Sequence, residues 1–371
     1  MNADRGGGYD DPVPDAQPKP NPGTPLRVDA TVTGAPFESL ERIDEAERLG
    51  LDRVLVTETA HDPFPLLAVA GQRTSRVELG TGVAIAFART PMTLAYSAWD
   101  LQAFTGGRAV IGLGSQVRAH VERRFGMPWS RPAARMREFV LATRAIWRSW
   151  EHGERLDFDG EFYRHTVMPA PFNPGPLPDG APPPRLLVAA VGPRMARTAG
   201  EVGDGILCHP LTTPDHLRRN VLPDVYAARQ TAMDEGAEWT GRMFEVCGGV
   251  LAAVGRDDRE LEAAIEGVRE RIAFYASTPG YQAVLEARGW GALHTELHEL
   301  SRQARWTEMG RLIDDEVFDA FAVSGSPVEA AREIDARYRG ALDRVSVVLA
   351  RRADLRTGLE TLIALRALAS E

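Results

Sequence analysis

Residues 77–115 have the sequence VELGTGVAIAFARTPMTLAYSAWDLQAFTGGRAVIGLGS, which predicts a strand, a helix and a second strand. The first strand is apolar and contains several β-branched residues. Thr90 is a good N-cap for the helix, Pro91 suits its first position, and Gly106 with Gly107 ends it. Two buried strands joined by a crossover helix form a βαβ unit, so this stretch implies a parallel sheet.

The same alternation of strands and helices continues on both sides of this unit. The predicted strands are 26–33, 51–57, 77–87, 108–114, 185–191, 205–209, 244–254 and 344–349. The predicted helices are 37–49, 64–72, 91–105, 139–150, 194–200, 217–233, 327–338 and 355–368. Eight strand–helix alternations are typical of the (β/α)8 TIM barrel, an α/β fold, and a doubly wound open sheet is the alternative.

Two segments are longer than a single crossover connection requires. Residues 151–184 contain FDGEFYRHT, a pattern typical of a small hairpin, and residues 258–320 are mostly helical. We therefore expect insertions after the fourth and seventh strands. Residues 1–25 are rich in Gly, Pro and Asp without periodicity, which predicts a disordered N-terminal tail. Residues 26–371 are expected to form one barrel domain.

Composition limits the classes of function. The chain has 371 residues, 44% of them hydrophobic, and a formal net charge of −9, which argues against non-specific nucleic-acid binding. Cys208 and Cys247 lie in apolar runs without CxxC spacing, so we expect small buried strand residues. No apolar run is long enough for a membrane span and no signal-peptide pattern occurs, so a cytoplasmic protein is expected. Barrels of this kind commonly pair, and a homodimer is one expected assembly.

Candidate catalytic residues follow the second strand, because TIM barrels carry their chemistry at the C-terminal ends of the strands. The imidazole of His61 could move a proton near physiological pH, or it could be a loop histidine beside the helix start at Asp62. Glu58 either faces the same cavity as a second carboxylate or pairs with an arginine. Both alternatives are open for each residue.

Candidate binding residues lie within the third strand and after two other strands. Small residues at 80–82 interrupt the third strand, which often marks a bulge or a close approach to the backbone. The fourth strand ends at Gly114, and the GxG at 112–114 is not a dinucleotide fingerprint because Val117 occupies the third glycine position. Residues 192–194, Gly-Pro-Arg, follow a strand and open a helix, so they either hold an anion or form a tight turn with an exposed arginine.

A local concentration of arginines follows the fourth strand. It could hold a long anionic ligand, or it could be a solvated face paired with Glu122 and Glu138. HExxH, EF-hand, Walker A and GxSxG motifs are absent from the sequence, so no metal site is predicted. The arginines are Arg118, Arg123, Arg124, Arg131, Arg135 and Arg137.

Several of these motifs together resemble the luciferase-like monooxygenase superfamily, and more narrowly its deazaflavin-dependent branch. The resemblance is carried by LDRVLVTETAHDPF, by the opening stretch, by FGMPWSRPAARMREFV with FDGEFYRHT, and by LLVAAVGPRMARTAGEVGDGILCHP. It covers the chain from about Leu26 to the C-terminus. It implies a barrel with an insertion that binds a flavin or the deazaflavin coenzyme F420 at the strand ends.

The resemblance also implies roles for individual positions. Gly80, Thr81, Gly82 and Val83 match the family's bulge, where members often have a non-prolyl cis peptide against the cofactor ring. Gly114, Ser115 and Gln116 would form the neighbouring wall of that pocket. Gly192, Pro193 and Arg194 match the segment that meets the cofactor phosphate. His61 lies near the proton-donating histidine of sugar-phosphate members, whereas the glutamate of those members is replaced by the stretch 115–118, Ser-Gln-Val-Arg.

The sequence therefore favours an F420-dependent oxidoreductase that moves a hydride between the deazaflavin and a small-molecule substrate, with His61 and Glu58 as candidate catalytic residues. Two alternatives share the fold: an FMN-dependent monooxygenase and a non-catalytic F420-binding protein. A metal-dependent barrel hydrolase would need a His/Asp ligand cluster that the strand ends lack.

Overall fold

The computed structural model describes residues 23–349 and 355–369. Eight parallel strands form a closed barrel, because the last of them in the sheet order, β8, pairs with β9. This confirms the TIM-barrel prediction and excludes the open sheet. The predicted tail, 1–25, lies outside the described residues except for its last three. The barrel strands are β1 (Arg27–Val32), β2 (Arg53–Val56), β3 (Glu78–Ile85), β4 (Ala109–Gly114), β7 (Arg185–Ala190), β8 (Gly205–Cys208), β9 (Glu245–Val254) and β11 (Arg344–Leu349).

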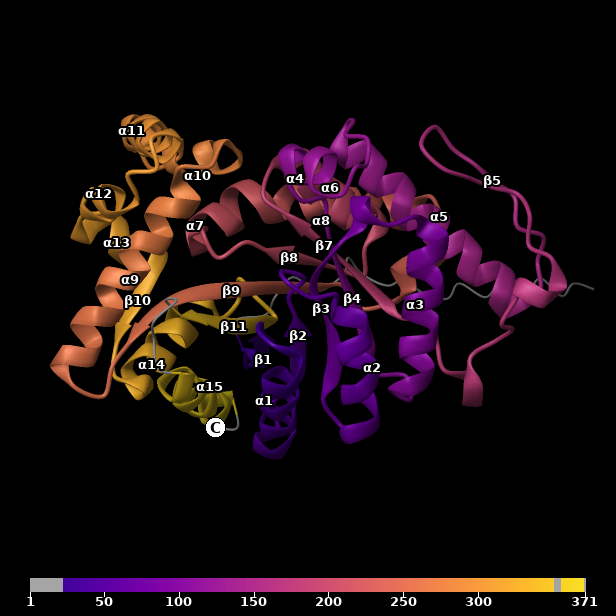
Figure 1. Ribbon diagram of the computed structural model, residues 1–371, viewed down its shortest axis with the longest axis horizontal. Helices are drawn as coiled ribbons and strands as arrows, with labels where there is room; N and C mark the ends of the chain where they lie inside the picture. Colours follow the sequence, from indigo (N-terminus) through magenta and orange to yellow (C-terminus); the bar gives the residue numbers. More distant parts are fainter. Residues whose placement is uncertain (1–22, 350–354, 370–371) are drawn as a thin grey trace, which may run out of the picture.

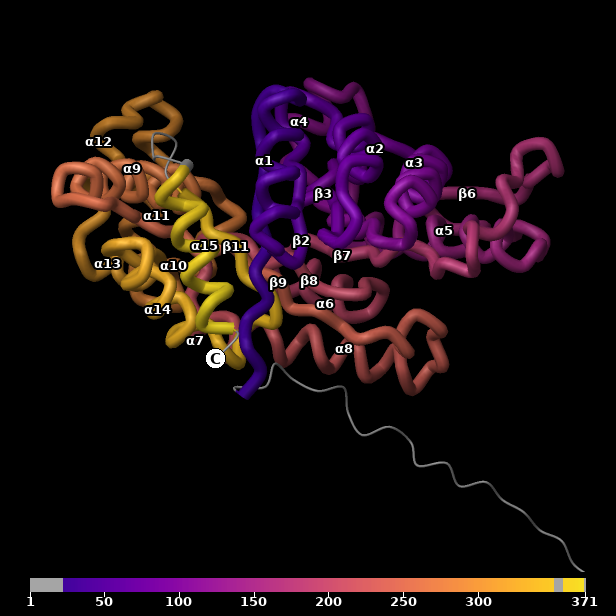
Figure 2. Tube along the Cα trace, turned by 90° about the horizontal axis from the view of Figure 1, so that it is seen from below, coloured from indigo at the N-terminus to yellow at the C-terminus, as the bar shows by residue number. Residues whose placement is uncertain are grey.

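The helices that surround the barrel begin where local chemistry favours helix starts. Thr90 and Asp62 accept backbone N–H bonds as N-caps, and Ser326 forms a capping box with Glu329. The predicted helix 139–150 is longer than expected, since it begins at Pro132. The outer helices, several of which are visible in Figure 2, are α1 (Pro36–Leu49), α2 (Pro63–Arg73), α3 (Pro91–Phe104), α5 (Pro132–His152), α6 (Pro193–Val202), α8 (Leu222–Asp234), α14 (Pro327–Tyr338) and α15 (Leu355–Ala369).

Both predicted insertions are present, at opposite ends of the molecule (Figure 1). The hairpin of β5 (Phe158–Asp159) and β6 (Arg164–His165) is antiparallel and projects outward. The second insertion packs its own apolar cluster against the far half of β9. Its helices are α9 (Asp258–Ala276), α10 (Gln282–Glu286), α11 (Gly291–Arg302), α12 (Trp306–Arg311) and α13 (Asp315–Phe321).

One additional strand was not predicted. β10 (Ala322–Gly325) pairs with residues 251–254 of β9, beyond the part of β9 that β8 covers. The four-residue sequence AVSG is too short and too weakly patterned to stand out beside a helical segment. It attaches the second insertion to the barrel sheet by backbone hydrogen bonds.

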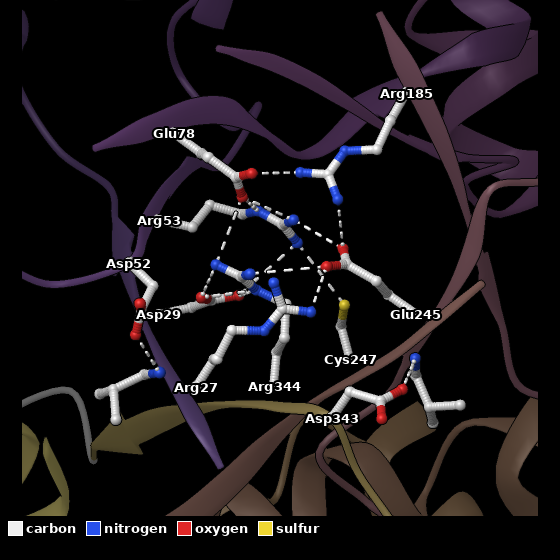
Figure 3. A network of polar contacts seen from close by, with 12 residues as sticks. Arg27, Asp29, Asp52, Arg53, Glu78, Arg185, Glu245, Cys247, Asp343 and Arg344 are labelled. Atoms are coloured by element: carbon white, nitrogen blue, oxygen red, sulfur yellow. Dashed lines mark hydrogen bonds and ion pairs between the residues drawn. The ribbon is translucent and has the colours of Figure 1, made fainter. Parts of the chain in front are cut away.

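The N-terminal end of the barrel interior is filled by a buried ion network (Figure 3). Arg53 is fully buried at the start of β2, and its Nη2 lies 2.7 Å from Glu245 Oε2 and 2.8 Å from Glu78 Oε2. Arg344 Nη2 lies 2.8 Å from Asp29 Oδ1, and Arg185 contacts both glutamates. None of these residues stands out in the sequence, because they lie at the strand ends opposite to those where TIM barrels carry their chemistry.

Above this charged layer the barrel interior is apolar. Val110, Leu187 and Cys247 form a small buried cluster, with Leu207 packed against it. Both cysteines are buried and free, as expected from their apolar surroundings. Within the described residues, no helix combines the length and the apolarity that crossing a membrane requires.

The carboxylate of Glu245 is expected to contribute stability that depends on pH. Burial alone raises its pKa, but Arg53, Arg185 and Arg344 outweigh burial and lower the pKa to about 2. Because the pKa in the folded protein is below the ordinary value of 4.5 for a glutamate, this stability is complete above pH 4.5 and is lost as the pH falls toward 2.

Glu245→Gln should lower the free energy of unfolding at pH 7 by about 3–5 kcal/mol, since it leaves buried arginines without a counter-charge. It should also flatten the acid dependence of stability, measured by urea unfolding across pH. The control is Glu154→Gln, whose carboxylate pairs with Arg148 at the exposed surface. If the two variants were equally stable, the network would not support the barrel.

Candidate functional site

The C-terminal end of the barrel interior is open to solvent. Side chains alternate along a strand, so residues two positions beyond the inward-facing Leu187 and Leu207 also face inward. These positions are Ala189 and His209, and both are partly exposed. Thr31, two positions beyond the network residue Asp29, is exposed although it lies within β1. We call this solvent-accessible mouth the basin, and the side chains at these three positions are uncharged.

One wall of the basin is the predicted bulge in β3. The peptide bond Gly82–Val83 is cis, and the register between β3 and β4 shifts between Thr81 and Ala84. Thr81 Oγ1 donates to the carbonyl of Gly112 at 2.7 Å. A Cβ on Gly114 would lie 2.6 Å from Val83 Cγ2, so glycine is required where β4 passes the bulge. The expectations of a bulge and of a non-prolyl cis peptide are confirmed.

Glu58 is an anchor of this bulge. Its Oε2 accepts hydrogen bonds from the backbone N–H of Ile85 at 2.8 Å and from Arg89 Nη1 at 2.7 Å. The Glu58 N–H donates to the carbonyl of Val83 at 3.3 Å. Its side chain is 8% exposed, so the arginine supplies the counter-charge that burial requires. Of the two alternatives for Glu58, pairing with an arginine is the one observed.

His61 lies in the loop between β2 and α2 and is exposed. The loop is held on both sides of it: Arg89 Nη2 contacts Asp62 at 2.9 Å, and Arg124 Nη2 donates to the carbonyl of Thr59 at 2.7 Å. Asp62 caps α2, as the structural alternative for this pair required. The catalytic role of His61 stays a prediction.

The ends of β4 and β7 supply two further edges of the basin. Gln116 has a left-handed backbone with φ of 60°, and its Oε1 accepts from the N–H of Val117 at 3.0 Å. Ser115 Oγ donates to the carbonyl of Gln116 at 3.2 Å. Gly192 is the N-cap of α6, and open space surrounds the position that a Cβ would take there. The backbone at this helix start is therefore accessible to a ligand.

The arginines after β4 are mostly engaged with the protein. Arg118 pairs with Glu122 at 3.0 Å, as the paired-face alternative required, whereas Arg137 pairs with Glu201 at 2.6 Å. Arg135 is buried, with its Nε donating to Tyr163 Oη at 2.8 Å. Glu138 was expected to pair with an arginine, but it accepts backbone N–H bonds from residues 161–163 of the hairpin instead.

His209 directly follows β8 at the C-terminal mouth of the barrel and was not among the predicted site residues. Its ring packs against Tyr275 and Tyr281 of the second insertion, with centroid distances of 4.5 and 4.4 Å. Strand alternation from Leu207 could have indicated its inward direction. The tyrosines are too distant in sequence for any local pattern to identify them.

Residues 23–344 match the family described as Luciferase-like monooxygenase. An uncharacterised protein of Mycobacterium tuberculosis (strain ATCC 25618 / H37Rv) is 46% identical over 86% of this chain and 92% of its own length. The F420-dependent glucose-6-phosphate dehydrogenase of Intrasporangium calvum is 30% identical over 81% of this chain and 84% of its own. The solved coenzyme F420 dependent tetrahydromethanopterin reductase from Methanopyrus kandleri covers 92% of this chain and 97% of its own, with a TM-score of 0.72 at 20% identity. The last likeness shows a common fold.

Arg89→Met should loosen the bulge and the loop before α2, because Glu58 would lose its counter-charge. We expect the free energy of unfolding to fall by about 2 kcal/mol, the scale of a hydrogen bond to a charged group. Amide exchange should accelerate at Ile85 and in residues 58–62, measured by mass spectrometry.

The control is Arg118→Met, which removes an exposed ion pair with Glu122. Adding Glu58→Gln to Arg89→Met should restore part of the lost stability, since the uncompensated charge disappears. Equal exchange in the wild type and Arg89→Met would contradict the anchoring role of this pair.

Proposed function

The chain belongs to the luciferase-like monooxygenase family, and on that premise we propose that it is an oxidoreductase that uses coenzyme F420 to transfer a hydride to or from a small organic substrate. The observation that carries the proposal is the open, uncharged basin beside the bulge at Gly82 and Val83. A planar conjugated ring binds best in a site lined mainly by uncharged side chains.

The residues at the mouth fit the two ends of this cofactor. Gly82 and Val83 would lie against the ring, with Gly114, Ser115 and Gln116 as the neighbouring wall. The start of α6 offers the accessible backbone N–H of Gly192 for a phosphate, since Pro193 opens the helix without an N–H of its own, and the exposed Arg194 adds a positive charge. Bound F420 would supply the carbon that accepts or releases the hydride.

The protein's own contributions would be orientation, shielding from water and proton movement. Glu58 and Arg89 fix the bulge, so Glu58 acts as a positioning residue. Gln116 stands where sugar-phosphate members have a glutamate, and an amide does not transfer protons as a carboxyl group does. His61 is then the candidate proton shuttle.

One relative supports F420 over FMN as the cofactor. The Intrasporangium dehydrogenase, 30% identical to this chain, is F420-dependent by name. An FMN-dependent monooxygenase would use the same basin, so the affinities for F420 and FMN distinguish the two functions.

Titration of the protein with F420 and with FMN, followed by absorbance and fluorescence, should show F420 binding at least about 10-fold more tightly. Gly192→Asp should weaken F420 binding by about 10-fold or more, because a carboxylate at the start of α6 repels the phosphate. The matched control is Gly241→Asp, because a Cβ added at Gly241 would also meet open space. Preferential FMN binding would favour the monooxygenase, and binding of neither cofactor would reject the proposal.

His61→Ala should leave the F420 dissociation constant unchanged, because the side chain is exposed and lies outside the proposed cradle. The rate of hydride transfer should fall by about 10²–10⁴-fold, the usual contribution of a positioned acid or base. The rate is measured as F420 reduction by a panel of small alcohols. An unchanged rate would remove His61 from the mechanism.

A further inference from the structure

His209 points into the mouth of the barrel in a fixed orientation. It follows β8 two positions after Leu207, which faces the barrel interior beside Val110 and Leu187. Tyr275 contacts the His209 ring edge-on, with an interplanar angle of 84°, and Tyr281 packs against it at 39°. These aromatic contacts from the insertion hold the imidazole plane in place.

The hydrogen bonding of His209 determines its tautomer. Nδ1 accepts the backbone N–H of Leu211 at 3.0 Å, which places the proton of a neutral ring on Nε2. Burial lowers the pKa of His209 to about 3, so the ring is neutral near physiological pH. Among the described residues the His209 side chain makes one hydrogen bond, through Nδ1; Nε2 accepts or donates none and is not among the fully buried atoms without a partner, and the residue is partly exposed. The free donor therefore faces the open basin.

The cavity beside His209 is lined without Asp, Glu, Lys or Arg side chains. It has a volume of about 10 Å³, the size of one water molecule, and is lined by Cys208, Thr212 and His216 together with apolar residues. Burial raises the pKa of Cys208 to about 12 and lowers that of His216, so both are neutral near pH 7. Thr212 Oγ1 and His216 Nδ1 are buried without partners among the described residues. Arg218, two positions after His216, does not line this cavity; it lines a separate hollow together with Arg288 and Arg337.

We propose that His209 binds the substrate by donating its Nε2–H to the oxygen of an uncharged carbonyl compound or alcohol, and that this wall rejects substrates bearing phosphate or carboxylate. An anion placed here would lose its hydration without gaining a counter-charge, whereas a neutral oxygen needs only one donor. The inference rests on the proposed function, since it names the substrate class of that oxidoreductase.

The first test is the ¹⁵N NMR spectrum of the F420-loaded protein with labelled histidine, with His209→Gln identifying the signal. We expect a neutral ring protonated at Nε2 from about pH 5.5 to about pH 8. The titratable groups that face the ring are Tyr275, Tyr281, Cys208 and His216. A signal from the imidazolium form in this range would overturn the proposal.

The second test titrates the same sample with cyclohexanone as the uncharged probe and glucose 6-phosphate as the anionic probe. Cyclohexanone should shift the Nε2–H signal, and glucose 6-phosphate should not. Binding of the phosphate in preference, or no response to cyclohexanone, would contradict the proposed substrate class.

Two variants separate the donor from the packing of the ring. His209→Phe keeps an aromatic ring between the tyrosines but removes the donor, so its dissociation constant for cyclohexanone should rise about 10-fold. His209→Gln retains an N–H group and should stay within about 3-fold of the wild type. F420 affinity should be unchanged in both. Failure of the wild type to bind F420 rejects the proposed function, whereas unchanged cyclohexanone affinity in His209→Phe rejects the role of His209.

Discussion

The barrel depends on the neutralisation of charge at its N-terminal end. Arg53 and Arg344 are enclosed by β-strands on all sides, and their charges are tolerable only because Asp29, Glu78 and Glu245 meet them at hydrogen-bond distance. This layer links the starts of six barrel strands, from β1 to β11 (Figure 3). It fills one end of the barrel with ions, whereas the opposite end is accessible to solvent and is where we propose that ligands bind.

Much of the fold was predictable because its signals are local. Apolar runs identified the eight barrel strands, and residues such as Thr90 with Pro91 identified helix starts. The strand β10 and the ion network were not predictable, since each arises from pairing between segments that are distant in sequence. The candidate site divides in the same way. The small residues at 80–82 signalled the bulge directly, whereas the partner of Glu58 and the contacts of His209 exist only after the barrel has closed.

The two walls of the basin have different origins. The cradle proposed for the cofactor comes from β3, β4 and the start of α6, which are parts of the barrel itself. The tyrosines that orient His209 come from the second insertion. Relatives with the same barrel bear names that imply different substrates, a sugar phosphate in one case and a pterin in another. Such diversity is expected when the barrel framework is constant and the segments around its C-terminal mouth differ.

The strand β10 limits how this insertion can behave. Because its backbone is hydrogen-bonded to the far half of β9, the insertion shares a strand with the barrel at one boundary and continues from β9 through α9 at the other. A segment tied at both boundaries to the same strand cannot swing away as a hinged flap. Tyr275 and Tyr281 are therefore already in place beside His209, and the substrate contact proposed for this histidine would need no closing movement of the insertion.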